Sequence, residues 1–244
     1  YRTALDNRIV TLLGIGLLLI SLFGGSAIPV TMPDLFGMSA ETLWILLLLG
    51  YCVVASVTPV QVLLQPRDYL ASYLLFAAIG IGVLSIFITA PDMQAASVSA
   101  FSPDDWPAAG PMWPMLFVTI ACGAISGFHS LVSSGTTCKQ LSDEAHACRI
   151  GYGGMLTEGF VGVLVIICVG AALTPEVLST TLRSGGGPIA AFSNGYGNLS
   201  LPLLGSYGTV FAVMALNAFI LTTLDTATRI GRYLTQELFG ISNM

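Results

Sequence analysis

One stretch of the sequence places a histidine among glycines and hydroxyl side chains inside an apolar segment. It runs from Cys122 to Thr137 and reads CGAISGFHSLVSSGTT. It begins like a membrane-spanning helix, but its glycines and hydroxyls interrupt the apolar run. Lipid satisfies no backbone hydrogen bonds, so a polar, glycine-broken segment at membrane depth is tolerated only inside protein or along a wet cavity. This stretch is therefore the first candidate for a binding site.

The residue types of this stretch fit the binding of a small solute and the transfer of a proton. The ends of half-helices present free N–H and C=O groups, which bind an anion or a small cation without a formal charge. His129 can accept and release a proton near neutral pH, so it is the first candidate for proton coupling. The alternative is close helix packing, because Gly123 and Gly127 have the small-xxx-small spacing. The predicted substrate-binding residues are Gly123, Ser126, Gly127, His129, Ser133, Ser134, Gly135 and Thr136.

Glu158 is a second candidate for proton coupling, because it also falls inside an apolar run. An ionisable group within a span costs at least ~2.5 kcal/mol on insertion scales, which makes it a functional hypothesis by default. Three interpretations stay open. Glu158 could carry the coupling proton, pair with a polar group on another helix, or lie near the cytoplasmic interface if its span starts later.

Asp225 lies near the end of the last apolar run and admits two interpretations. Its i, i+4 spacing from Arg229 favours an ion pair along one helix face. Thr222 and Thr226 share that face, and with Asp225 they would give an oxygen cluster for a hard cation such as Na⁺. Both the ion pair and the ion-binding set Thr222, Asp225 and Thr226 stay open.

Composition places the chain in a membrane. Of its 244 residues, 55% are hydrophobic and 9% are charged, whereas a soluble domain carries about 25% charged residues. Eight Lys and Arg in all leave no basic face for nucleic acid. Cys138 and Cys148 flank His146 without a common zinc spacing, so we expect neither a metal nor another cofactor. The chain opens on Tyr1 rather than Met, and we expect it to be a single transmembrane segment, residues 1–244, of a longer protein.

The apolar runs predict an all-α, polytopic helical bundle with about six spans and at least one broken helix. About twenty apolar residues cross a bilayer as a helix. The predicted spans are residues 9–30, 42–64, 69–90, 112–134, 151–174 and 207–228, with Pro59 kinking the second. The last helix should continue past its span and stop at Gly240. Between the fifth and sixth spans we expect a plain flexible loop over residues 176–205, with a re-entrant or gating segment as the alternative.

The cationic residues set the orientation. Seven lie on one side of the predicted membrane and Arg183 alone lies on the other. By the positive-inside rule both ends of the chain then face the cytoplasm. The seven are Arg2, Arg8, Arg67, Lys139, Arg149, Arg229 and Arg232.

Two other classes of protein were weighed against a transporter. An intramembrane hydrolase built from His129 with Ser130, Ser133 or Cys138 fits poorly, because the chain has no G-x-S-x-G nucleophile elbow and adjacent residues point apart on a helix. A passive channel stays open, because hydroxyls and broken backbone also line pores.

Several blocks of the sequence resemble the carbon starvation protein A family. The block Ala121–Thr137 is similar to the family signature, with Cys138 where the family often has proline. Three further blocks follow the family order, namely Gln65–Leu70, Ile150–Glu158 and Leu224–Arg229.

This resemblance implies a secondary transporter of the bacterial inner membrane, related in fold to the amino acid–polyamine–organocation transporters. It implies that pyruvate or short peptides are taken up during carbon starvation by alternating access, driven by protons. It also implies that the protein is not an enzyme. A sodium-coupled symporter is the alternative to proton coupling. The expected partners are the lipid bilayer, the small-molecule substrate with H⁺ or Na⁺, and the remaining helices of the full-length chain. The sequence leaves open the choice between pyruvate and peptide, the coupling ion and the oligomeric state.

Overall fold

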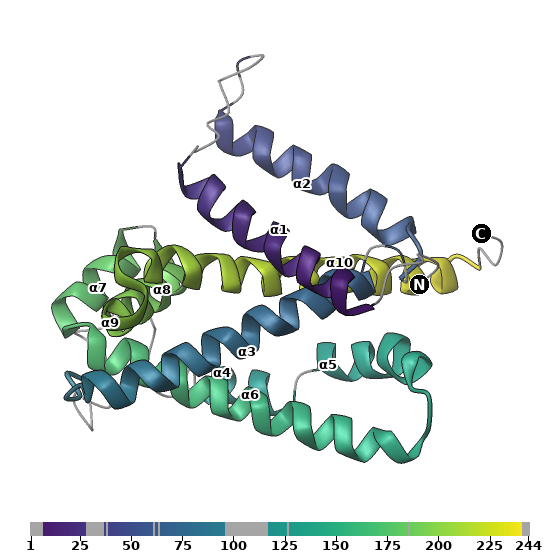
Figure 1. Cartoon of the computed structure of the whole chain (residues 1–244). Coiled ribbons are helices and arrows are strands. Elements are labelled where there is room, and N and C mark those ends of the chain that lie inside the picture. Colours follow the sequence, from purple (N-terminus) through teal and green to yellow (C-terminus); the bar gives the residue numbers. More distant parts are fainter. Residues whose placement is uncertain are drawn as a thin grey trace. The chain divides into compact units, whose positions relative to one another are not determined.

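The computed structural model describes residues 7–27, 37, 39–60, 62, 64–95, 117–125, 127–184 and 186–240. Every regular element in these ranges is a helix (Figure 1), so the all-α prediction is confirmed. The longer helices are α1 (Asn7–Ala27), α2 (Ala40–Val57), α3 (Leu64–Thr89), α6 (Ala145–Ala172), α8 (Gly187–Leu199) and α10 (Gly208–Leu238). The shorter ones are α4 (Phe117–Ala124), α5 (Gly127–Val132), the π-helical turn η2 (Ser133–Thr137), the 3₁₀ turn η3 (Cys138–Gln140), α7 (Pro175–Arg183), α9 (Leu201–Leu204) and the 3₁₀ turn η4 (Gly205–Tyr207).

Four stretches of helix in the described ranges are long and apolar enough to cross a membrane. They are Ala40–Val57, Leu64–Thr89, Ala145–Ala172 and Leu201–Leu238, and they overlap the second, third, fifth and sixth predicted spans. The first predicted span corresponds to α1, with an apolar stretch at Ile9–Ser21. Residues 28–30 and 112–116 of the predicted spans lie outside the described residues, and the total of six stays a prediction.

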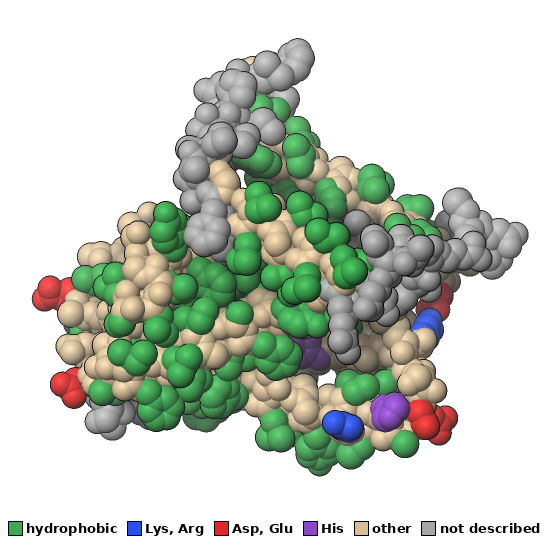
Figure 2. Space-filling view, in the orientation of Figure 1, with side chains coloured by type: hydrophobic (Ala, Val, Ile, Leu, Met, Phe, Trp, Pro, Cys, Tyr) green, Lys and Arg blue, Asp and Glu red, His purple; other side chains and the backbone are tan. Residues whose placement is uncertain are grey.

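The outer surface of the long helices is apolar. Figure 2 shows a face on which hydrophobic side chains are spread over all the described helices and charged side chains are few. Large side chains such as Leu12, Phe76 and Phe87 are exposed, whereas a soluble monomer rarely exposes contiguous apolar patches of this extent. The chain is therefore a multi-pass membrane protein whose exposed apolar faces require lipid or further helices.

The helices form two compact units, one of residues 1–77 and 214–244 and one of residues 78–213. In the first, α2, the beginning of α3 and the greater part of α10 contribute the buried side chains, which include Cys52, Ala55 and Leu64. In the second, Tyr196 of α8 is 1% exposed, and its hydroxyl donates to Ala78 O of α3 at 2.8 Å.

Residues 176–205 do not form the plain loop that the sequence predicts, because helices α7, α8 and α9 occupy most of them. The Thr174 hydroxyl caps the start of α7 by accepting a bond from Val177 N, and Pro175 fits the first helical position. Helix α8 packs against α6 so closely that a Cβ at Gly195 would collide with Cys168 O. Six residues of α8 are buried. Gly195 and Gly197 therefore serve helix packing rather than chain flexibility.

Candidate functional site

The helix that carries the polar stretch is broken, as the sequence predicts. Helix α4 ends at Ala124, and Ile125 N donates to Ala121 O at 2.9 Å. Helix α5 then begins at Gly127. Ser126 lies outside the described residues. The interruption falls at a Ser-Gly pair, one of the few local causes of sharp helix kinks.

A second irregularity of the backbone follows directly after α5, which ends at Val132. Residues Ser133–Thr137 form a π-helical turn, in which the Cys138 amide bonds to Ser133 O, five residues back. The hydroxyl of Ser134 donates to Leu131 O at 3.3 Å, and the thiol of Cys138 donates to Ser134 O at 2.7 Å. Single π-turns occur frequently at functional sites, because they change which side chains a helix presents.

The structure brings most of the predicted substrate-binding residues onto one short segment. Gly127 and His129 lie on α5, and Ser133, Ser134, Gly135 and Thr136 follow directly in η2, while Gly123 lies on α4 on the other side of the interruption. His129 is exposed, and its ring centroid lies 6.2 Å from that of Phe128. Their assignment to a substrate stays a prediction.

Glu158 lies near the middle of α6 rather than at its beginning. Helix α6 starts at Ala145, thirteen residues earlier, which is about 20 Å along a helix. The side chain is exposed, and no hydrogen bond or ion pair joins it to another of the described residues. Its role in proton coupling stays a prediction.

An ionic cluster in the first unit joins α2, α3 and α10. Arg67 Nη1 lies 2.6 Å from Asp225 Oδ2 and donates at 2.6 Å to the Tyr51 hydroxyl. That hydroxyl in turn donates to Asp225 Oδ2 at 2.9 Å. The Asp225 side chain is fully buried, and the Arg67 side chain is 27% exposed. Three helices thus converge on one carboxylate oxygen.

Arg229 does not form the predicted ion pair with Asp225. Its Nη2 instead donates to Ala55 O at 2.9 Å and to Thr58 O at 2.6 Å, at the end of α2. The cause is Pro59, which has no N–H to donate to Ala55 O four residues back. The prediction that Pro59 kinks the second span is also wrong, because α2 ends at Val57. A cation at the carbonyl end of a helix is stabilised by the helix dipole.

The two threonines of the predicted sodium set use their hydroxyls on their own helix. Thr222 Oγ1 donates to Phe219 O at 2.7 Å, and Thr226 Oγ1 donates to Thr222 O at 3.1 Å. Each hydroxyl oxygen keeps lone pairs for a cation. The bonded partners of Asp225 are, however, Arg67 and Tyr51. The sodium site stays a prediction.

Tyr51 and Arg67 are the functional candidates that sequence reasoning missed. The sequence pattern indicates Arg67 as one of the charges that set the orientation and as part of the block Gln65–Leu70, but not as a partner of Asp225. Tyr51 lies within an apolar run. The signal available in the sequence is that a tyrosine hydroxyl in such a run requires a hydrogen-bond partner.

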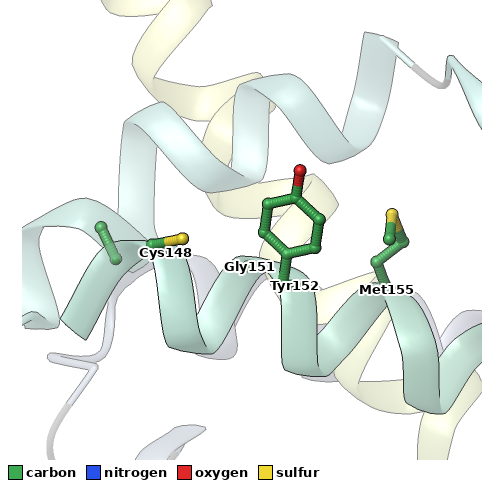
Figure 3. A pocket seen from close by; sticks show the side chains of 5 residues that line it. Cys148, Gly151, Tyr152 and Met155 are labelled. Atoms are coloured by element: carbon green, nitrogen blue, oxygen red, sulfur yellow. The ribbon is translucent and has the colours of Figure 1, made fainter.

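A hollow of about 320 Å³ lies along α6, lined by Ala147, Cys148, Gly151, Tyr152 and Met155. Figure 3 shows the Tyr152 ring standing away from the helix, with its hydroxyl at the far end. All five lining residues belong to one helix, and none of them is charged. A ligand site has a few convergent polar groups, so this hollow is not the candidate site. Among the described residues no group of three His, Cys, Asp or Glu side chains could hold a metal ion.

Comparisons with known proteins extend along nearly the whole chain. The family model described as carbon starvation protein CstA matches residues 1–186 and 171–243. A peptide transporter CstA of Helicobacter pylori is 33% identical over 280 residues, which cover 95% of this chain and 40% of that protein. One of Bacillus subtilis is 32% identical over 273 residues, with 98% of this chain and 46% of that protein covered.

A pyruvate/proton symporter BtsT of Escherichia coli K12 is also similar. It is 30% identical over 301 residues, which cover 95% of this chain and 42% of that protein. The chain thus spans less than half the length of these relatives. No solved structure matches the chain significantly.

Proposed function

The chain belongs to the carbon starvation protein CstA family, and on this premise we propose that it forms part of a proton-coupled uptake transporter for pyruvate or short peptides. The names of the relatives support both substrate classes, since those of Helicobacter pylori and Bacillus subtilis are peptide transporters and one of Escherichia coli is a pyruvate/proton symporter. The proposed location is the bacterial inner membrane with both ends of the chain in the cytoplasm, supported by the asymmetry of Lys and Arg.

The observation that carries the proposal is the interrupted helix at Ile125, followed by the π-turn Ser133–Thr137. Irregular backbone at membrane depth is expected only where it lines a cavity or is buried in protein. Interrupted helices near the midplane are a recurrent site architecture in secondary transporters, because they present unpaired backbone groups to substrate and coupling ion. The hydroxyls of Ser133, Ser134 and Thr136 supply further hydrogen bonds without a formal charge.

His129 is the proposed proton carrier of this segment, with Glu158 as the second. An imidazole changes charge between about pH 5 and 8, so His129 can take a proton on the acidic side of the membrane and release it on the other. Its exposure next to the helix interruption leaves the ring accessible to a proton and a substrate. Glu158, exposed on α6, would pass the proton onward. Alternating access around this segment would then couple proton entry to solute entry.

Uptake by the protein carrying this chain, reconstituted in proteoliposomes, tests the proposal. We expect labelled pyruvate or a labelled dipeptide to accumulate under an inward proton gradient and a protonophore to abolish accumulation. Replacing sodium by choline should leave uptake unchanged, and a sodium requirement would transfer the coupling role to the set Thr222, Asp225 and Thr226. Equilibration of both solutes without accumulation would support a channel and reject the proposal.

A matched pair of histidine variants tests the coupling residue. His129→Gln should abolish gradient-driven uptake and leave exchange of internal for external substrate intact. His146→Gln is the control, because His146 is exposed at the beginning of α6 and its Nδ1 lies 3.4 Å from the Ser142 hydroxyl, outside the interrupted segment. Unchanged gradient-driven uptake in His129→Gln would reject the role of His129.

A further inference from the structure

Glu158 is a charged group near the middle of the long apolar helix α6. Its side chain is exposed, and no hydrogen bond or ion pair joins it to another residue in the described ranges. A carboxylate that faces lipid at this depth costs at least ~2.5 kcal/mol on insertion scales, and such groups are almost always turned toward protein or a water-filled cavity. The side of α6 that carries Glu158 therefore requires a covering element.

Three glycines lie on the same side of α6 as this carboxylate. The set consists of Gly151, Gly154, Glu158 and Gly162. Spacings of three, four and four residues place all four on one side of an α-helix. A Cβ at any of these glycines would meet nothing within 4 Å, so none of them serves a contact within the described part of the chain. Small residues of this kind let a second helix approach closely in a membrane. We name this side of α6 the Glu158 face.

The hollow along α6 lies at the beginning of the Glu158 face. Its volume is about 320 Å³, and Figure 3 shows the side chains of Tyr152 and Met155 rising from the helix beside Gly151. A hole of this kind on one helix accepts a side chain of a neighbouring helix in knobs-into-holes packing. Leu164 lies on another side of α6, where it is buried and a Cβ at Gly82 of α3 would touch it. The Glu158 face is thus separate from the side that packs within the second unit.

We propose that the Glu158 face docks a membrane-spanning helix from the remainder of the same protein, and that this helix places a Lys, Arg or His side chain opposite Glu158. The chain covers 40% of its Helicobacter pylori relative and 46% of its Bacillus subtilis relative, and a protein of that length has further chain to supply such a helix. A carboxylate that a neighbouring helix buries requires a cationic, hydrogen-bonding partner. The proposal goes beyond the proposed function and does not require it.

A second copy of this chain and lipid alone fit the Glu158 face less well. In a two-fold dimer the same face meets itself, which brings two Glu158 carboxylates together, and like charges across an interface repel. Lipid offers a carboxylate no hydrogen bond. A basic side chain on a docked helix neutralises Glu158. It also gives Glu158 a group within hydrogen-bond reach, which the transfer of a proton requires.

Photocrosslinking of the complete protein that contains this chain, in its native membrane, tests the docking directly. Met155, at the edge of the hollow, is replaced by p-benzoylphenylalanine, and crosslinked peptides are identified by mass spectrometry. We expect a crosslink to an apolar segment of the same molecule outside residues 1–244, with a Lys, Arg or His within about two helical turns of the crosslinked residue. A crosslink to a second copy or to a residue within 1–244, lipid adducts alone, or a segment without a basic residue would each overturn the proposal.

Two leucine variants give a matched control for the face. Gly151→Leu fills the Glu158 face and should lower the yield of the Met155 crosslink about tenfold, because a bulky side chain prevents close approach of the helices. Gly153→Leu adds the same side chain on another side of α6, where a Cβ also meets nothing within 4 Å, and should leave the yield unchanged. Equal yields would overturn the proposal. The crosslink with both glycines in place keeps the test decisive if Gly151→Leu does not fold.

Exchange of the two charges tests the pairing with Glu158. Glu158→Lys alone should lose the crosslink, because it sets two cations opposite each other. Glu158→Lys combined with replacement of the basic residue of the docked helix by Glu should restore the crosslink, and failure to restore it would overturn the pairing. These measurements require no substrate. A docked helix in a protein that accumulates neither pyruvate nor dipeptide would therefore reject the proposed function and support the docking.

Discussion

Arg67→Met is predicted to destabilise the protein because it leaves the Asp225 carboxylate buried without its cation. Breaking a buried ion pair by removing one partner costs about 3–5 kcal/mol. The Asp225 side chain is 0% exposed and the Arg67 side chain is 27% exposed. Water can therefore enter the position that Arg67 vacates, which places the expected loss at the lower end, about 3 kcal/mol.

A double-mutant cycle separates this charge effect from lost packing. Asp225→Asn retains the bond from Tyr51 and should cost about 1 kcal/mol. Arg67→Met combined with Asp225→Asn leaves no buried charge unpaired, so the penalty for an isolated carboxylate is absent. The double variant still loses the contacts of the Arg67 guanidinium and should cost about 2 kcal/mol. The coupling energy is then about 2 kcal/mol.

Unfolding by SDS titration in mixed micelles measures these free energies. Arg183→Met is the control, because Arg183 is exposed at the end of α7, and such surface substitutions stay within about 0.5 kcal/mol. A coupling energy below about 0.5 kcal/mol would mean that the two residues contribute independently, and it would refute the account of the cluster.

Three further predictions use the same unfolding measurement. Arg229→Met leaves Ala55 O and Thr58 O without the Arg229 donor and should cost about 3 kcal/mol, while Arg229→Lys should recover part of this loss. A loss in Arg229→Met no larger than that of Arg183→Met would contradict this prediction. Gly195→Ala directs a methyl group at backbone Cys168 O and should cost about 2 kcal/mol. Its control, Gly153→Ala, places the methyl group in open space on α6 and should be neutral or stabilising by up to about 1 kcal/mol. Equal effects of the two variants would show that α8 does not pack tightly on α6. Tyr51→Phe removes the hydroxyl that donates to Asp225 and accepts from Arg67, and it should cost about 2 kcal/mol, reduced to below about 1 kcal/mol in the Asp225→Asn background.

The long helices and the broken one were predictable because their signals are local. Apolar runs of about twenty residues predict α2, α3, α6 and α10, although the second predicted span ends seven residues after α2 and the fifth begins six residues after α6 does. The Ser-Gly pair at residues 126–127 predicts the interruption after α4. Gly240 has φ +64° and follows the end of α10 at Leu238, as expected for a helix stop.

The ionic cluster was not predictable, because its partners are distant in the sequence. Asp225 and Arg67 are 158 positions apart, and helical periodicity relates only residues three or four apart. The i, i+4 spacing therefore indicated Arg229, which the structure assigns to the end of α2. The missing N–H of Pro59 was the available signal, because a helix that ends at a proline leaves a carbonyl that requires another donor.

Helices α7–α9 were missed because glycines and hydroxyls are typical of loops. The start of α7 nevertheless carries a local signature, with Thr174 as N-cap followed by Pro175 and Glu176. For α8 the local signature is weaker, because Pro188 lies in its first turn but no side chain caps it. Packing stabilises this helix: a Cβ at Gly195 would meet Cys168 O, and one at Gly197 would meet Thr209. Close approach between helices is a tertiary property that a single sequence does not display.

Proton-coupled uptake requires that solute and proton enter together, and the internal pH of proteoliposomes reports their joint entry. A pH-sensitive dye is enclosed in vesicles that carry the protein, with no gradient imposed, and pyruvate or a dipeptide is added outside. Coupled uptake predicts acidification of the vesicle interior that is absent from protein-free vesicles and from His129→Gln. Entry of labelled solute without any change in internal pH would contradict proton coupling.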